Sequence, residues 1–97
     1  MRTICMIIVT LPLALTGAAF GADAPPGASS CSGCHPAARS VDTTVPRLAG
    51  RDAAQLVTAM QDFKSGKRPS TVMDRIAKGF TDDETKAIAT WYAAQKD

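Results

Sequence analysis

Two cysteines and a histidine lie within five consecutive positions, in the order Cys31-Ser32-Gly33-Cys34-His35. On a helical turn, this spacing places the two thiols on the same side of the backbone. The imidazole that follows Cys34 is a common ligand for transition metals. This order is typical of covalent haem attachment, in which the sulfurs form thioether bonds and the histidine binds the iron. The motif therefore predicts one haem c, anchored by Cys31 and Cys34 and ligated by His35.

Two other uses of paired cysteines fit this chain less well. Thiol–disulfide exchange is typical of a βαβ setting, and the sequence shows no strand-like alternation. A structural zinc site needs a second pair of cysteine or histidine ligands, and His35 is the only histidine in the chain. We therefore interpret His35 as an axial ligand of iron.

The second axial ligand is predicted to be a methionine. Met60 lies in the apolar stripe of a regular helical pattern, where methionine commonly fills a core. Met73 follows a proline-containing loop and precedes a short helix, so its thioether can be held against iron. Packing against Ile76 and Phe80 is the structural alternative for Met73. With both axial positions filled there is no open site on the iron, which favours electron transfer over catalysis or ligand sensing.

The beginning of the chain has the layout of a secretory signal peptide. A basic residue at position 2 precedes an apolar run from Ile4 to Leu15, and small residues follow up to Gly21. An uncleaved membrane anchor is the alternative, but the run is shorter than the roughly 20 residues of a span and contains Pro12. We therefore predict a signal peptide over 1–21, export to the periplasm, and no stable membrane insertion once this leader is removed.

The remaining part, residues 22–97, is predicted to be one small domain. Removal of the leader takes away Arg2 and Cys5, which leaves ten basic and nine acidic residues. Such a balance argues against nucleic-acid binding. A domain of about 76 residues buries little apolar surface, so a haem is expected to complete the core. We expect the haem-free chain to be largely disordered.

Helical patterns occupy most of this domain, which predicts an all-α fold of three to five short helices. One helix is expected over 52–64, with Gly66 as its stop. Another begins at the capping box of Thr81 and Glu84 and continues to about Lys96. We expect one short helix that carries the CxxCH motif and a second short helix after Met73 that Gly79 interrupts. Loops are expected over 36–50 and 66–70, and an extended lead-in over 22–30. In the last helix, the side chains of Ile88, Trp91 and Tyr92 are expected to face inward.

The chain resembles a class I monohaem cytochrome c from Cys31 to about Gln95. Beyond the CxxCH motif, the resemblance lies in Pro46-Arg47-Leu48-Ala49-Gly50, in Met73 and in the aromatic C-terminal helix. It implies a cytochrome c domain over 22–97 that wraps one covalently attached haem.

The same resemblance implies roles for Pro46 and Leu48. The carbonyl of Pro46 would accept a hydrogen bond from His35, and Leu48 would pack on the haem; an ordinary turn is the structural alternative. Arg47 and Arg51 would neutralise a propionate, although exposed arginines are usually only solvated.

A narrower resemblance covers residues 63–66 and 70–80. These segments are similar to the cytochrome subunit of flavocytochrome c sulfide dehydrogenase, in which a separate FAD-bearing chain oxidises sulfide and passes electrons to the haem. The resemblance implies a haem subunit that accepts electrons from a flavoprotein. A free diffusible periplasmic carrier of the cytochrome c553 kind and a haem-based ligand sensor or peroxidase-like enzyme remain as alternatives.

Any flavin would have to come from a partner, because the chain has no flavin-binding fingerprint. A set of basic residues near Met73 would steer a negatively charged redox partner, and a solvated surface explains them equally well. These residues are Lys64, Lys67, Arg68, Arg75 and Lys78.

Overall fold

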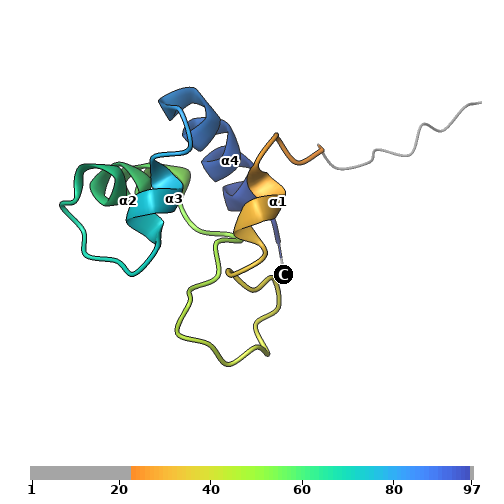
Figure 1. Ribbon diagram of the computed structural model, residues 1–97. Coiled ribbons are helices and arrows are strands. Elements are labelled where there is room, and N and C mark those ends of the chain that lie inside the picture. The colour runs from red at the N-terminus through yellow and green to blue at the C-terminus, as the bar shows by residue number, and fades with distance from the viewer. Residues whose placement is uncertain (1–22, 97) are drawn as a thin grey trace, which may run out of the picture.

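The computed structural model describes residues 23–96, which form four helices joined by loops (Figure 1). The signal peptide predicted over 1–21 lies outside the described residues. Between 23 and 96 no residue is in a strand, so the predicted all-α class is confirmed. In the same range, no helix is long and apolar enough to cross a membrane. The helices are α1 (Ala28–Cys31), α2 (Ala53–Ser65), α3 (Met73–Ala77) and α4 (Asp82–Ala94).

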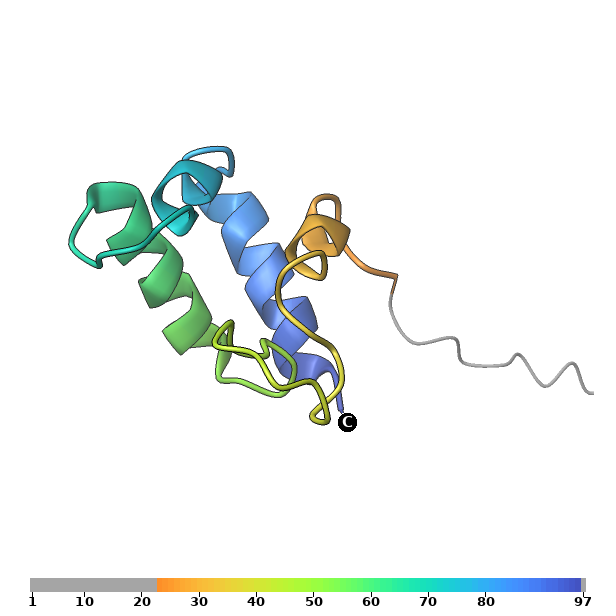
Figure 2. The same cartoon turned by 60° about the horizontal axis from the view of Figure 1, so that its bottom comes forward.

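The last helix, α4, lies between α1 on one side and α2 and α3 on the other (Figure 2). It begins at the predicted capping box: Glu84 N donates to Thr81 Oγ1 over 3.2 Å, and Thr81 N donates to Glu84 Oε2 over 2.9 Å. Ile88 and Tyr92 are both buried, as expected, and Trp91 is half-buried. The sequence therefore predicts both the capping box and the buried side of α4 correctly.

The helix α2 also begins and ends at the predicted signals. The side chain of Asp52 accepts a hydrogen bond of 3.0 Å from Gln55 N, which caps the first turn. At the other end Gly66 adopts a left-handed conformation with φ 79°. The expected helix over 52–64 is thus correct to within one residue at each end. α2 packs against both α3 and α4.

The buried core is small. Ala28, Ile88 and Tyr92 form its centre, and half-buried apolar side chains pack around them. Among the described residues no large side chain is fully buried, and no residue of α2 is buried at all. A domain with so little buried apolar area is stabilised by any apolar ligand that it encloses. The half-buried neighbours of the core are Cys31, Leu48, Leu56, Phe80 and Trp91.

The N-terminal part of the domain differs from the prediction. The extended lead-in was expected to reach residue 30, but α1 begins at Ala28. Ala28 is 0% exposed, and its carbonyl accepts a buried hydrogen bond of 2.6 Å from Tyr92 Oη. This contact joins positions 64 apart in the chain, so no local sequence pattern predicts the helix.

The short helix expected to carry the whole CxxCH motif ends at Cys31. The following residues form a turn, in which Cys34 N and His35 N both donate to Cys31 O, over 3.2 and 2.9 Å. These two bonds keep the backbone tightly coiled beyond the end of α1. The two cysteines and His35 therefore remain on one compact turn, although only Cys31 lies in the helix.

Candidate functional site

The side chain of His35 contacts the backbone of Pro46. The distance between His35 Nδ1 and Pro46 O is 2.5 Å. A carbonyl oxygen only accepts hydrogen bonds, so Nδ1 has to carry the proton in this contact. In the neutral imidazole, Nε2 then has an unshared electron pair, which is the form that binds a metal ion.

The segment over 46–51, which contains Pro46 and a turn over 48–51, is held by three hydrogen bonds. Arg47 Nε donates to Ala37 O over 2.8 Å, which ties the turn to the loop after the cysteines. Arg51 N donates to Leu48 O over 3.2 Å, which closes the turn itself. Gly50 N donates to Tyr92 O over 3.0 Å, which attaches the turn to α4. The carbonyl of Pro46 is thus fixed relative to the rest of the domain.

The two cysteines differ in their surroundings. Cys31 is half-buried beside the core and Cys34 is exposed, and neither forms a disulfide. Burial is the main cause that raises the pKa of the Cys31 thiol, so this sulfur is protonated at neutral pH. Among residues 23–96, no group of three or more histidine, cysteine and acidic side chains is arranged to hold a metal ion.

The predicted second ligand, Met73, is the first residue of α3. Ser70 holds the start of this helix: Asp74 N donates to Ser70 Oγ over 2.9 Å, and Ser70 Oγ donates to Asp74 Oδ1 over 3.2 Å. Met60 lies in the middle of α2, and both methionines are half-buried. Burial therefore does not separate the two candidates, whereas position does, because only Met73 adjoins a loop.

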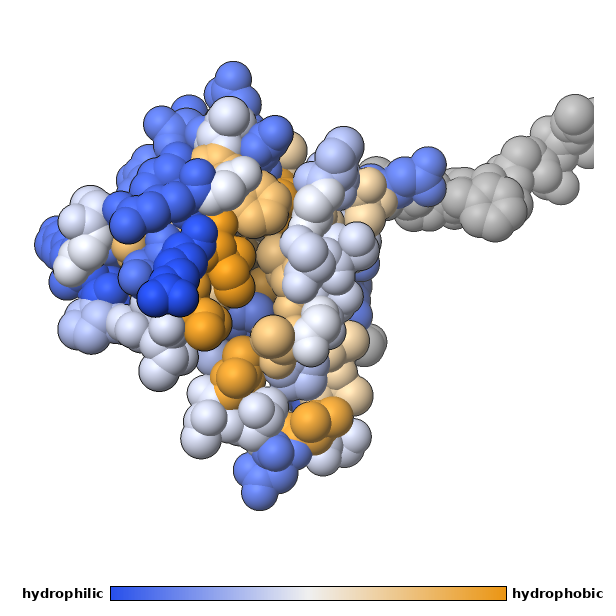
Figure 3. Space-filling model, in the orientation of Figure 1, coloured by the Kyte–Doolittle hydropathy of each residue, from blue (hydrophilic) through white to orange (hydrophobic). Residues whose placement is uncertain are grey.

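Hydrophobic side chains gather in a hollow between α3 and α1 (Figure 3). α1, which leads into the CxxCH turn, and α3, which begins at Met73, lie on opposite sides of α4 (Figures 1 and 2). Within residues 23–96, three large hydrophobic residues are more than a third exposed: Val41 (51%), Val72 (51%) and Ile76 (40%). Ile76, which the sequence offered as a packing partner of Met73, is thus exposed, and Ala77 is the buried residue of α3. The hollow therefore offers an apolar surface to a ligand.

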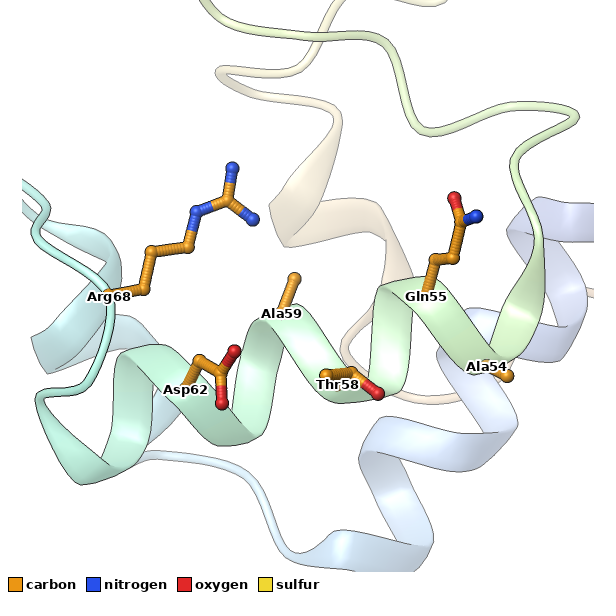
Figure 4. A pocket seen from close by; sticks show the side chains of 6 residues that line it. All are labelled: Ala54, Gln55, Thr58, Ala59, Asp62 and Arg68. Carbon is orange, nitrogen blue, oxygen red and sulfur yellow. The ribbon is translucent and has the colours of Figure 1, made fainter.

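Two other depressions lie away from the CxxCH motif. One, of about 310 Å³, runs along α2, where Figure 4 shows Gln55, Ala59 and Arg68 projecting to the same side. The other, of about 690 Å³, is bounded by the lead-in and by Trp91 on α4. None of the six residues predicted for the site lines either depression.

Several cations near the site are engaged within the chain. Lys64 Nζ donates to Phe80 O over 2.6 Å and lies 3.8 Å from Asp82. The guanidinium of Arg68 covers the ring of Phe63, 5.0 Å from its centroid. Arg47 likewise donates to a backbone carbonyl. These contacts favour structural roles for the three side chains over the steering and propionate roles considered from the sequence.

The first two known proteins similar to this chain are both named as cytochromes. Over 63 residues it is 41% identical to a protein of Chlorobaculum tepidum named cytochrome subunit of sulfide dehydrogenase, a match that covers 65% of this chain and 57% of that protein. It is 35% identical to a cytochrome c4 of Pseudomonas aeruginosa, over 94% of this chain and 48% of the relative. The chain is a relative of the c-type cytochromes.

A third relative of this cytochrome-like chain is named thiosulfate dehydrogenase electron acceptor. It comes from Thiomonas intermedia and is 37% identical over 71% of this chain and 34% of its own length. The chain thus spans about half the length of the first two relatives and a third of this one. No protein-family model matches the chain.

The geometry of this cytochrome relative fits a haem c. The contact with Pro46 O favours the His35 tautomer that can bind iron, Cys31, Cys34 and His35 share one turn, and the domain has an apolar hollow and a small core (Figure 3). Leu48 is half-buried against that core, close in sequence to the carbonyl that orients His35. In this arrangement Cys31 and Cys34 could hold a haem macrocycle, and His35 could bind its iron.

Proposed function

We propose that this chain is a periplasmic electron-transfer domain with a single haem c. In this proposal Cys31 and Cys34 are the thioether anchors, and His35 and Met73 are the axial ligands. The observation that carries the proposal is the contact between His35 Nδ1 and Pro46 O, because it leaves Nε2 as the ligand atom. When bound, the haem supplies a one-electron oxidation–reduction couple.

The residues that hold the haem would determine its reduction potential and whether a substrate could reach the iron. The carbonyl of Pro46 holds the imidazole of His35 in orientation and increases its basicity. The neutral thioether of Met73 favours the reduced state of iron and so a relatively high potential. If His35 and Met73 both held the iron, no open position would remain on it for a substrate. The arrangement suits an electron acceptor, not an enzyme that makes or breaks bonds.

The proposed electron donor is a separate FAD flavoprotein that oxidises sulfide. Support comes from the identity of 41% to the Chlorobaculum tepidum protein, whose name describes a cytochrome subunit of a sulfide dehydrogenase. The resemblance of residues 63–66 and 70–80 to that kind of subunit points the same way. A free diffusible carrier is the second candidate, because two of the relatives are named as electron acceptors of thiosulfate dehydrogenase.

Native purification from the periplasmic fraction tests the proposal. We expect a processed chain that begins near residue 22, a haem c spectrum, and a co-purifying chain with one FAD per haem. A haem protein that elutes alone, without flavin, would favour the diffusible carrier. Rapid binding of carbon monoxide by the reduced protein would contradict six-coordinate iron and favour the ligand sensor.

A further inference from the structure

Tyr92 contacts both of the segments on which the pairing of His35 with Pro46 depends. Its hydroxyl donates to Ala28 O over 2.6 Å, in a buried hydrogen bond. Its own backbone carbonyl accepts from Gly50 N over 3.0 Å. One residue of α4 therefore holds α1 through its side chain and the Pro46 turn through its backbone.

The first connection leads from the Tyr92 hydroxyl to the imidazole. Ala28 is the first residue of α1 and is 0% exposed, so its carbonyl has no access to water. α1 continues to Cys31, whose carbonyl accepts the hydrogen bond from His35 N over 2.9 Å. A continuous run of hydrogen-bonded backbone thus joins the tyrosine hydroxyl to His35.

The second connection leads from the Tyr92 carbonyl to Pro46. Gly50 adopts φ 73°, a left-handed conformation that glycine takes without strain, and its amide points to α4. The next amide, of Arg51, closes the turn on Leu48 O. Pro46 precedes this turn, which spans Leu48 to Arg51, and lies four residues before Gly50 in the same segment, so the anchor at Gly50 limits where its carbonyl can lie.

We infer that Tyr92 is a positioning residue for His35, which sets the separation of the imidazole from the Pro46 carbonyl by holding both segments against α4. This inference rests on the proposed function, because the separation matters through the ligand role of His35. The hydrogen bond from Gly50 N to the backbone carbonyl of Tyr92 does not depend on the side chain, whereas the bond from the Tyr92 hydroxyl to Ala28 O is removed by Tyr92→Phe. The ring stays, together with its edge-on contact with Trp91 at 4.9 Å.

A purely structural role for Tyr92 predicts a different pattern. Loss of a core contact lowers global stability and accelerates by the same factor the exchange of those protons that exchange only through global unfolding. Loss of a positioning contact acts first on the proton of His35 Nδ1. Ile88→Val is the matched control, since Ile88 belongs to the same core cluster and carries no hydrogen bond in its side chain.

The experiment measures hydrogen exchange by NMR in the reduced, haem-loaded protein, together with the reduction potential. In Tyr92→Phe we expect exchange of the His35 Nδ1 proton to accelerate about tenfold more than that of the α2 amides, as for loss of one hydrogen bond. The potential should rise, because a weaker bond to Pro46 makes the imidazole less basic. In Ile88→Val both kinds of proton should accelerate equally and the potential should stay unchanged.

Two results would overturn the inference: equal acceleration of the His35 and α2 protons in Tyr92→Phe, or a potential that matches Ile88→Val. Failure of the proposed function looks different, because the wild-type protein would then contain no haem and show no shifted His35 signal. The wild-type spectrum therefore separates the two failures before any variant is compared.

Discussion

Gly27 lies against the ring of Phe80, so closely that a β-carbon at this position would stand 2.6 Å from Phe80 Cε1. The same glycine has φ 87° and forms the N-cap of α1. The approach brings the start of α1 onto the loop between α3 and α4. The absence of a side chain at Gly27 is therefore a requirement for the placement of the whole CxxCH segment.

Replacing this glycine is expected to destabilise the protein strongly. In Gly27→Ala the left-handed backbone and the overlap with Phe80 add together, and the free energy of unfolding should fall by about 3 kcal/mol. Gly66→Ala is the control, because Gly66 has φ 79° but nothing within 4 Å of its added β-carbon. That variant should lose only about 1 to 2 kcal/mol. Equal losses in urea unfolding would show that the contact with Phe80 is unimportant.

Substitution of the two methionines tests the axial ligand. Met73→Leu should abolish the sulfur-to-iron charge-transfer band of the oxidised protein and lower the reduction potential, because the thioether that favours reduced iron is lost. Met60→Leu keeps the volume of a half-buried side chain in α2 and should leave the spectrum unchanged. An unchanged spectrum in Met73→Leu, with loss of the band in Met60→Leu, would reverse the assignment.

The two arginines near Pro46 are expected to behave differently from each other. Arg47→Ala removes the hydrogen bond to Ala37 O that ties the Pro46 turn to the preceding loop, and should cost about 1 kcal/mol of stability. Arg51 is exposed, so Arg51→Ala should change stability by less than about 0.5 kcal/mol. Thermal unfolding of both variants checks this. Similar losses in the two would instead favour the shared propionate role considered from the sequence.

Stability should also depend on the ionisation of Tyr92. Burial is the main cause that raises the pKa of Tyr92 above its ordinary value, and the negative charge of Cys31 adds to it where that thiol is ionised. The folded state therefore holds the phenol proton more tightly than the unfolded state. The resulting stabilisation is complete below the unfolded pKa of about 10 and is lost as the pH rises through the folded pKa.

Tyr92→Phe lacks this ionisation, so the stability advantage of the wild type over the variant should shrink as the pH rises above about 10. Urea unfolding of both proteins between neutral and alkaline pH measures the difference. An advantage that stays constant across this range would mean that the hydroxyl of Tyr92 ionises equally in both states.

Features with local causes were predictable from the sequence. The capping box of Thr81 and Glu84 and the stop at Gly66 act through hydrogen bonds within three residues or through backbone conformation alone. Helix spacing in the last segment placed Ile88 and Tyr92 on the buried side. In the candidate site, the contact of His35 with Pro46 was expected only through family resemblance, because it spans eleven positions.

Features that depend on long-range packing were not predictable. α1 forms where Ala28 meets Tyr92, a contact between the two ends of the domain that leaves no periodic pattern in a four-residue helix. The partner of Lys64 is a backbone carbonyl at Phe80, which only the fold brings within reach. Sequence reasoning also missed Tyr92 as a link between two segments, since half of this link is made by its backbone.

Covalent attachment of haem is the claim on which the account depends most, and intact-mass measurement after acid–acetone extraction tests it most directly. We predict that the extracted protein stays red and that its mass exceeds that of the processed polypeptide by one haem. Colourless protein with the mass of the bare polypeptide would contradict the account.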